Sequence, residues 1–208
     1  MIILWDLHDV VFHKTHYAWL RKLYSCPEKR KIIKNLSFSL NKMLTTFMLN
    51  KLKLSKKEVT SEELIQCAYE SKNPALARLV HDFSHVYKPD TEVTYIIKQL
   101  SEQQYTQHVC SNIGPTLFAL LQKKFPTIMD CFSYAKIVAY HKEDTVKKPD
   151  PVFFMSYLKE SGIQPNTIIF IDDKQKNVDS AKQCGMKGIH FKNGLLLRQE
   201  LEQYDIVL

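Results

Sequence analysis

Four segments of the sequence carry side chains that together could perform phosphoryl chemistry. Asp6 follows the apolar run Ile2–Trp5, and the pair Asp172-Asp173 follows another apolar run. Ser111 follows a third run, and Lys148 stands in a segment before a helical pattern. A carboxylate such as that of Asp6 can attack phosphorus and form an aspartyl phosphate, which splits hydrolysis into two easier steps. These residue types therefore predict a site for an anionic substrate.

An aspartate approaches an anionic phosphate only if positive charge is supplied nearby. Asp6 together with Asp172 or Asp173 could hold Mg²⁺, which binds carboxylate, carbonyl and water oxygens and bridges to phosphate. Lys148 and the hydroxyl and backbone N–H of Ser111 would stabilise the phosphoryl oxygens. We therefore expect Mg²⁺ as the cofactor.

The elements that must position these side chains are predicted to be strands alternating with helices. Ligands of open α/β sheets bind at the carboxyl ends of the strands, where Asp6, Ser111 and Asp172 would meet. Short apolar runs typical of buried parallel strands cover Ile2–Trp5, Thr106–Cys110, Lys136–Ala139, Thr167–Ile171 and Gly188–Phe191. Helical spacing covers Thr91–Ser101, Thr116–Lys124, Val152–Ser161 and Val178–Cys184.

The segment between the first strand and Thr106 is predicted to contain an inserted helical subdomain. Nearly all of it has helical spacing, and Thr60 with Glu63 forms a pattern typical of a helix start. Because this insertion is too long for a crossover connection, we expect an α/β core at residues 1–13 and 89–208 and a helical cap at residues 14–88. The cap would lie over the crevice at the strand ends.

The sequence resembles the haloacid dehalogenase-like superfamily in four motifs: "IILWDLHDVVF", "HVCSNIGPTLF", "VKKPDPVFF" and "IIFIDDKQKNVDSAKQCGMKGIHF". It is most similar to helical-cap phosphatases such as the sugar-phosphate phosphatases and the N-terminal phosphatase domain of epoxide hydrolase. The resemblance implies a Rossmann-like open parallel sheet with a helical cap inserted after the first strand. It also implies a small phosphorylated metabolite as the substrate.

Position by position, the resemblance makes Asp6 the nucleophile. It implies that Ser111 and Lys148 are catalytic residues that hold the phosphoryl group, with Asn112 beside them in the phosphate site. Mg²⁺ would bind at the same edge of the sheet.

For the metal, the resemblance implies Asp6, the backbone carbonyl of His8 and Asp173 as ligands. Asp172 would act beside them, directly or through water. Asn177 would support the loop that carries the two aspartates.

The first motif departs from the family at two positions. The family usually has Asp-x-Asp-Gly, and here His8 replaces the second Asp while Asp9 replaces the Gly. A backbone carbonyl serves the metal at position 8, so the substitution bears on the acid–base step, which contributes about 10²–10⁴-fold. Histidine can move a proton near neutral pH, so His8 is either a replacement acid and base or a structural residue. Asp tolerates the unusual backbone conformation of a Gly position better than most residues.

Three functions therefore stay open at this point. The first is a Mg²⁺-dependent phosphatase with His8 in the acid–base position. The second is a catalytically weak or inactive protein that binds a phosphorylated ligand or a partner. The third is dehalogenase or phosphonatase chemistry, which the pair Asp172-Asp173 disfavours because two carboxylates suit a metal and a phosphate better than a halide.

Composition and charge set the remaining expectations. The chain has 208 residues and a formal net charge of +7, and Lys outnumbers Arg in its basic segments, which favours a solvated face over nucleic-acid binding. The five cysteines have no metal-ligand spacing, which indicates reduced thiols. "MIILW" is too short for a signal peptide or membrane span. We expect a cytoplasmic protein without nucleic-acid or membrane partners.

Two further histidines lie within apolar strand segments. His108 and His190 are predicted to be satisfied core or edge residues rather than ligands.

Overall fold

The computed structural model describes residues 1–14, 87–138 and 145–208. The chain divides into two compact units. The first unit comprises residues 1–13, 89–115 and 125–208, and the second comprises residues 14–88 and 116–124. The helices predicted between residues 17 and 83, and with them the helical cap, lie outside the described residues. All predicted site residues belong to the first unit.

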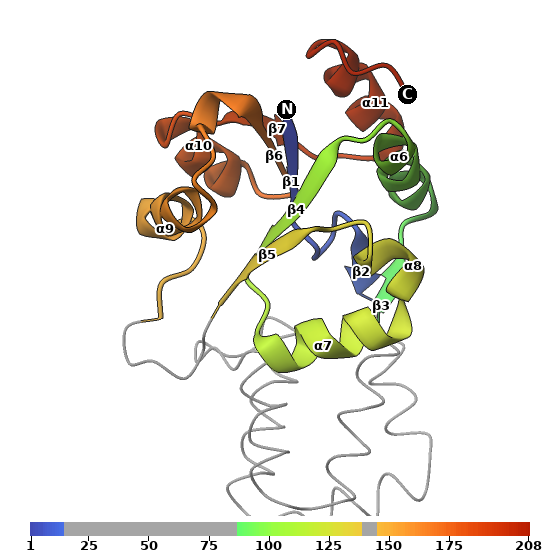
Figure 1. Cartoon of the computed structure of the whole chain (residues 1–208), viewed down its shortest axis with the longest axis horizontal. Helices are drawn as coiled ribbons and strands as arrows, with labels where there is room; N and C mark the ends of the chain where they lie inside the picture. Colours follow the sequence, from blue (N-terminus) through green and yellow to red (C-terminus); the bar gives the residue numbers. More distant parts are fainter. Residues whose placement is uncertain (15–86, 139–144) are drawn as a thin grey trace, which may run out of the picture. The chain divides into compact units, whose positions relative to one another are not determined.

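A five-stranded parallel sheet forms the centre of the first unit, in the order β5-β4-β1-β6-β7 (Figure 1). β1 is the middle strand, and its residues pair in register with β4 on one side and β6 on the other. The strands are β1 (Ile2–Trp5), β4 (Thr106–Ser111), β5 (Tyr134–Ile137), β6 (Ile168–Asp172) and β7 (Lys187–His190).

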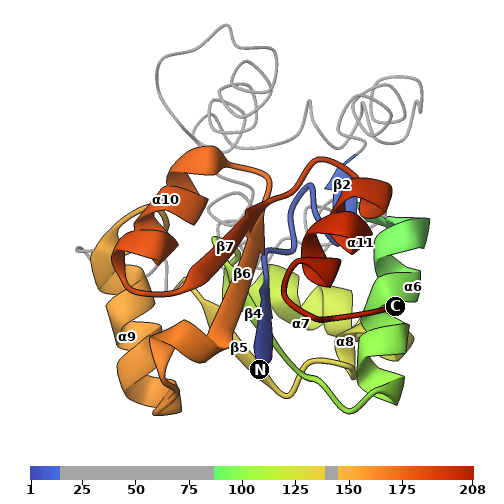
Figure 2. The same ribbon diagram turned by 90° about the horizontal axis from the view of Figure 1, so that it is seen from above.

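Helices cover both faces of this sheet (Figure 2). α9 (Pro151–Ser161) and α10 (Gln175–Gln183) lie on one face, while α6 (Thr91–Glu102) and α11 (Gly194–Glu202) pack together on the other. The short elements are α8 (Pro126–Met129), the 3₁₀ turn η2 (Pro165–Thr167), and the strands β2 (Phe12–Lys14) and β3 (Tyr87–Pro89) where the chain crosses between the units. α7 (Pro115–Lys124) belongs almost entirely to the second unit.

Apolar side chains of the central strands fill the space under α9 and α10. Leu4 and Phe170 belong to one buried cluster with Phe154 and Tyr157 of α9. The rings of Phe154 and Phe170 meet edge to face, with centroids 5.2 Å apart. Full burial of such a side chain stabilises the fold by about 1.5–3 kcal/mol, so this cluster holds α9 against the sheet.

Local sequence signals explain where the helices begin. Three of the described helices have Asp or Asn as the N-cap, and each cap oxygen accepts a hydrogen bond from a backbone N–H of the first turn. The pairs are Asp90 with Val93 (α6), Asp150 with Val152 (α9) and Asn193 with Leu196 (α11). Pro151 in the first turn of α9 adds a second start signal.

The α/β fold class predicted from the sequence is confirmed, and all five strands lie within two residues of their expected positions. Among the predicted elements, the largest differences are at β5, which begins at Tyr134 rather than Lys136, and at α10, which begins at Gln175 rather than Val178, while α11 was not predicted. Every residue of β5 is only half-buried, because this strand lies at the edge of the sheet and has no continuous apolar run. The first turn of α10 is polar, and Gln175 and Lys176 in it are exposed, so periodicity alone could not find it.

Candidate active site

Parallel pairing brings the predicted site residues to one edge of the sheet. Asp6 follows β1 directly, and its backbone N–H donates to the carbonyl of Ile171 in β6 (2.9 Å). Ser111 is the last residue of β4, and Asp172 is the last residue of β6. Because β4 and β6 flank β1, their carboxyl ends converge on Asp6.

Asp6 is buried, and one of its carboxylate oxygens receives three contacts. Oδ1 accepts hydrogen bonds from the Ser111 hydroxyl (2.6 Å) and the Leu7 backbone N–H (2.8 Å), and it lies 3.1 Å from Lys148 Nζ. These donors hold the carboxylate in one orientation at the end of β1 and offset its negative charge.

Lys148 is a buried cation, only 3% exposed, between two carboxylates. Its Nζ donates to Asp172 Oδ2 (2.6 Å) and to the backbone carbonyl of Cys110 (2.7 Å), in addition to its contact with Asp6. Burial by itself lowers the pKa of Lys148, but the charges of Asp6 and Asp172 outweigh burial and raise this pKa above its usual value. Lys148 therefore stays protonated and binds both aspartates.

Asn112 fixes the segment that carries Lys148. Its amide N–H donates to the Lys148 carbonyl (2.8 Å), and its amide oxygen accepts from the Lys148 backbone N–H (2.9 Å). This paired bonding ties the end of β4 to the Lys148 loop. Direct binding of phosphate by Asn112 stays a prediction.

Asp172 is fully buried and bonded at both carboxylate oxygens. The Asn177 amide donates to Oδ1 (2.8 Å) and to Oδ2 (2.9 Å), and the Lys174 backbone N–H donates to Oδ1 (2.9 Å). Asn177 is itself buried on α10. Asn177 therefore holds the carboxylate of the last residue of β6, and its support of the following loop stays a prediction.

Asp173, the next residue, lies in a different environment. Its buried Oδ1 has no hydrogen-bond partner among the described residues, and the nearest cation, Lys174 Nζ, is 3.9 Å away and exposed. Burial is the main cause that raises the pKa of Asp173 to about 6; the charge of Lys174 lowers this pKa, and the charges of Asp6 and Asp172 raise it. An unsatisfied carboxylate beside two others is unfavourable unless a proton or cation compensates it.

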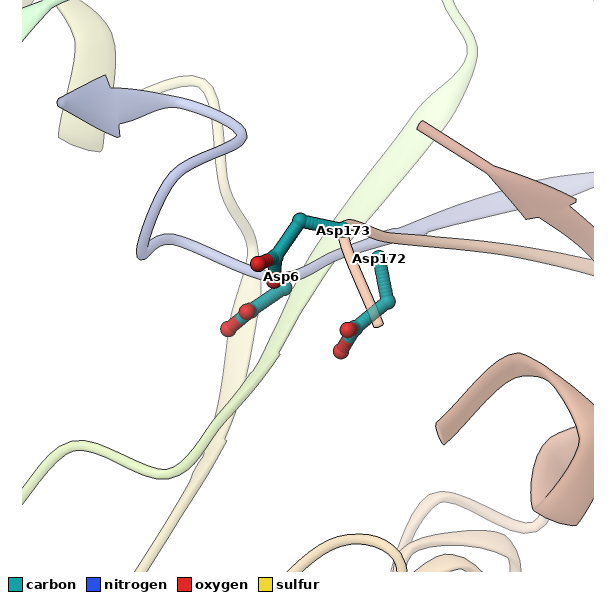
Figure 3. Close-up of side chains that lie close together, drawn as sticks. All are labelled: Asp6, Asp172 and Asp173. Atoms are coloured by element: carbon teal, nitrogen blue, oxygen red, sulfur yellow. The ribbon is translucent and has the colours of Figure 1, made fainter. Parts of the chain in front are cut away.

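The three aspartates can offer ligand atoms to one cation. One carboxylate oxygen from each of Asp6, Asp172 and Asp173 lies within 4.8 Å of the others, and Figure 3 shows the three side chains gathered at the ends of β1 and β6. Oxygen ligands with this charge suit a hard divalent ion such as Mg²⁺. The orphan oxygen of Asp173 shows that these residues fit the predicted metal.

The turn after Asp6 carries the departure from the family motif. Asp9 has a φ of 61°, the left-handed region that Gly usually occupies, as its place in the motif predicted. The turn is closed by hydrogen bonds from the Asp9 N–H to the Phe12 carbonyl (2.9 Å) and from the Phe12 N–H to the Leu7 carbonyl (2.8 Å). His8 is half-buried and pairs with Phe12 in an isolated bridge. The backbone of the turn is thus closed by its own hydrogen bonds, with His8 at the position of the family's second Asp.

Two other described histidines, His108 and His13, have polar partners. His108 is buried on β4, where its Nδ1 is 2.9 Å from the Tyr157 hydroxyl, so the prediction of a satisfied core histidine is confirmed. His13 Nε2 lies 2.7 Å from Asp90 Oδ2.

The site contains groups that motif reasoning did not find. The carbonyl of Cys110 accepts from Lys148, and the ring of His190 contacts the carbonyl of Asp173. A backbone carbonyl leaves no mark in the sequence, so Cys110 could not have been identified. His190 ends a strand adjacent to β6, and this position was the one available signal.

Comparison with known families defines the class of protein. A family model described as haloacid dehalogenase-like hydrolase matches residues 3–191, and the chain belongs to this family. The match spans the strand ends that carry all the site residues described above.

Individual relatives add detail. The chain is 27% identical over 117 residues to the sesquiterpene phosphatase astK of Aspergillus oryzae, covering 56% of this chain and 57% of that protein. It is 34% identical over 70 residues to the phospholysine phosphohistidine inorganic pyrophosphate phosphatase of Xenopus laevis, covering 32% of this chain and 26% of that protein. The chain therefore spans little more than half of the first relative and about a quarter of the second.

A solved structure shares the fold. It is a haloacid dehalogenase family enzyme of Bacteroides thetaiotaomicron in complex with magnesium and inorganic phosphate, with a TM-score of 0.62 and 19% identity. The similarity covers 93% of this chain and 94% of that one.

Among the described helices, none is both long and apolar enough to cross a membrane.

Proposed function

We propose that this hydrolase is a Mg²⁺-dependent phosphatase that acts on a small phosphorylated metabolite through an aspartyl phosphate on Asp6. The observation that supports the proposal most strongly is that a carboxylate with several donors and a carboxylate oxygen without a donor lie together at one edge of the sheet. Asp6 is held by Ser111 and Lys148, while Asp173 beside it has a buried oxygen without a donor. The first arrangement suits a nucleophile, and the second suits a metal ligand.

In the first step, a carboxylate oxygen of Asp6 attacks phosphorus and the bond to the leaving oxygen breaks. Ser111 and Lys148 contact Asp6 Oδ1 in the free protein, and in this step they would donate to the phosphoryl oxygens instead as negative charge develops there. Mg²⁺, held by Asp6, Asp173, the His8 carbonyl and Asp172 directly or through water, would neutralise phosphate charge. In the second step, water attacks the phosphorus of the aspartyl phosphate and frees Asp6.

His8 is proposed as the acid and base of these two steps. It would give a proton to the leaving alkoxide in the first step and take one from water in the second. An imidazole can hold either protonation state near neutral pH, so it can act in both directions. His8→Ala should then lower kcat by about 10²-fold and remove one limb of the pH–rate profile. An unchanged rate and profile would exclude His8 from proton transfer.

The names and ligands of the similar proteins support a phosphatase over the alternatives. The fungal and Xenopus relatives are phosphatases by name, and the Bacteroides structure is a complex with magnesium and phosphate. A dehalogenase would form a carbon ester on its aspartate. That reaction does not require three clustered carboxylates that could bind a metal. A binding protein without turnover keeps the same phosphate contacts, so only an assay separates it from the enzyme.

A cytoplasmic location is part of the proposal. Cys110, Cys131 and Cys184 are free thiols, which fits a reducing compartment.

The test is phosphate release from an aryl phosphate and from panels of sugar phosphates, isoprenoid phosphates and nucleotides, each with Mg²⁺ and with a chelator. The proposal predicts release that depends on Mg²⁺ and that is absent from Asp6→Asn. No release from the panel, with a positive control active, would contradict it. Halide release from a haloacid without metal would favour the dehalogenase.

A further inference from the structure

Asp173 differs from its neighbours because nothing in the described structure fixes its carboxylate directly. Asp6 and Asp172 each accept at least two hydrogen bonds, whereas Asp173 Oδ1 has none and its carboxylate lies 3.9 Å from an exposed lysine. The direction of the Asp173 side chain therefore depends on how its backbone is held.

The side chain of His190 contacts the backbone of Asp173. His190 ends β7, the edge strand next to β6, and its Nε2 lies 3.0 Å from the carbonyl oxygen of Asp173. The His190 backbone is in register with Asp172, and the Phe191 N–H donates to the Asp172 carbonyl (2.9 Å). The backbone pairing of β6 with β7 thus ends at Asp172. The imidazole of His190 adds one further contact between the two segments, at Asp173.

We propose that His190 is a positioning residue that fixes the main chain of Asp173 and so pre-orients the carboxylate for a divalent cation. The inference rests on the proposed function, because it assigns the metal to Asp173. It does not make His190 a ligand, and the prediction that His190 is an edge residue rather than a ligand is consistent with it. Groups that orient a ligand in this way typically contribute about 10–100-fold to metal affinity.

The hydrogen bond requires a particular tautomer of His190. A carbonyl oxygen only accepts, so Nε2 must carry the proton. Lys192 Nζ lies 3.1 Å from the same Nε2, and a lysine ammonium cannot donate to a protonated nitrogen. Lys192 is exposed and free to turn toward solvent, whereas the Asp173 carbonyl is fixed in the loop, so we assign the proton to the bond with Asp173. Lys192 then has no part in metal binding.

A matched pair of amide substitutions tests this role. In His190→Gln the amide nitrogen can occupy the place of Nε2 and keep an N–H for the carbonyl, whereas the shorter side chain of His190→Asn cannot reach it. Both variants are neutral and polar, which limits differences in folding. The probe is Mn²⁺, with free ion counted by electron paramagnetic resonance, and the unfolding midpoint is measured without metal for each variant.

The expected result is a Mn²⁺ dissociation constant about tenfold higher for His190→Asn than for the unmodified protein, and a value within about twofold for His190→Gln. Lys192→Met should bind Mn²⁺ like the unmodified protein. In phosphate release, His190→Asn should raise the Mg²⁺ concentration needed for half-maximal rate and leave the rate at saturating Mg²⁺ within about threefold.

Equal affinities for the Asn and Gln variants would overturn the proposal, as would a loss of affinity in Lys192→Met equal to that of His190→Asn. A role confined to stability would lower the unfolding midpoint of His190→Asn without changing its Mn²⁺ affinity, and this also overturns it. If the unmodified protein binds no Mn²⁺, the metal site itself fails. A Mn²⁺ site that His190 does not affect leaves the proposed function standing.

Discussion

Asp172 and Asp173 are adjacent in the sequence, yet their carboxylates have opposite hydrogen-bonding environments in the structure. Asp172 is saturated by Asn177, Lys148 and the Lys174 N–H, whereas Asp173 has a buried oxygen with no donor. Asp6 resembles Asp172, with one oxygen that receives Ser111, Leu7 and Lys148. The edge of the sheet therefore has one region, Asp6 and Asp172, whose carboxylates receive several donors and share one cation, and one region, Asp173, with a buried oxygen that has no donor.

The difference indicates separate roles for the carboxylates of the site. Carboxylates with many protein donors are held rigidly and are stable without any ligand. A carboxylate without donors is costly in the free protein and becomes favourable when a cation binds. Asp6, the proposed nucleophile, belongs to the first group with Asp172, whereas Asp173, a proposed metal ligand without donors of its own, belongs to the second.

The largest expected effect is on the rate of phosphate release, and it follows from a substitution of Asp6. Asp6→Asn removes the nucleophile, and we expect phosphate release to fall by more than about 10³-fold at saturating Mg²⁺. The amide keeps the shape of the side chain, so the circular dichroism spectrum should be unchanged. Residual activity within tenfold of the unmodified protein would show that another group attacks phosphorus.

The next effect concerns stability. Lys148→Met leaves Asp6 and Asp172 buried without their shared cation, and we expect a loss of about 3–5 kcal/mol in the free energy of unfolding without metal. Urea unfolding measures this loss. The loss should shrink when Mg²⁺ is present, because the ion supplies part of the missing charge.

The matched control for Lys148→Met is Lys174→Met, which removes an exposed lysine from the same site. Its effect on stability should lie within about 0.5 kcal/mol. Similar losses in the two variants would contradict the idea that burial between two carboxylates makes Lys148 special.

Substitutions at the two adjacent aspartates should have opposite signs. Asp173→Asn removes an uncompensated carboxylate, so the protein without metal should become more stable by about 1–2 kcal/mol at pH 7. Asp172→Asn breaks a buried pair with Lys148 and should destabilise by about 2 kcal/mol or more. Urea unfolding in the presence of a chelator compares them. Destabilisation of similar size in both would remove the distinction between the two regions.

The last expected effect is a dependence of stability on pH. The pKa of Asp173 is raised from 3.8 to about 6, so between these values the folded state binds more protons than the unfolded state. Stability without metal should therefore fall as pH rises through this window, by about 1–2 kcal/mol more than in Asp173→Asn. Thermal unfolding at several pH values measures the difference between the two proteins. Parallel profiles would mean that Asp173 titrates normally.

The strands and the position of the site at their carboxyl ends could be predicted from the sequence, because buried parallel strands have continuous apolar runs. The runs before Asp6, Ser111 and Asp172 located the strand ends, and the chain order located the site. The positive φ of Asp9 also followed from its place in the motif. These are local signals that a single sequence carries.

The unequal environments of Asp172 and Asp173 could not be predicted. Asp172 receives Lys148, which is distant in the sequence, together with the nearby Asn177 and Lys174 N–H, and none of these groups donates to Asp173. The sequence shows two identical residues side by side, and only the geometry of the loop after β6 decides which of them receives the donors. The cap helices predicted within residues 14–88 lie outside the described residues, so the cap stays a prediction.

The most direct test of the central claim is the stereochemical course at phosphorus. A phosphorothioate monoester of defined [¹⁶O,¹⁸O] configuration, made from an ester that the panel shows to be a substrate, would be hydrolysed in H₂¹⁷O. Attack by Asp6 and then by water inverts phosphorus twice, so the account predicts net retention in the released thiophosphate. Net inversion would show direct attack by water and would contradict an aspartyl phosphate on Asp6.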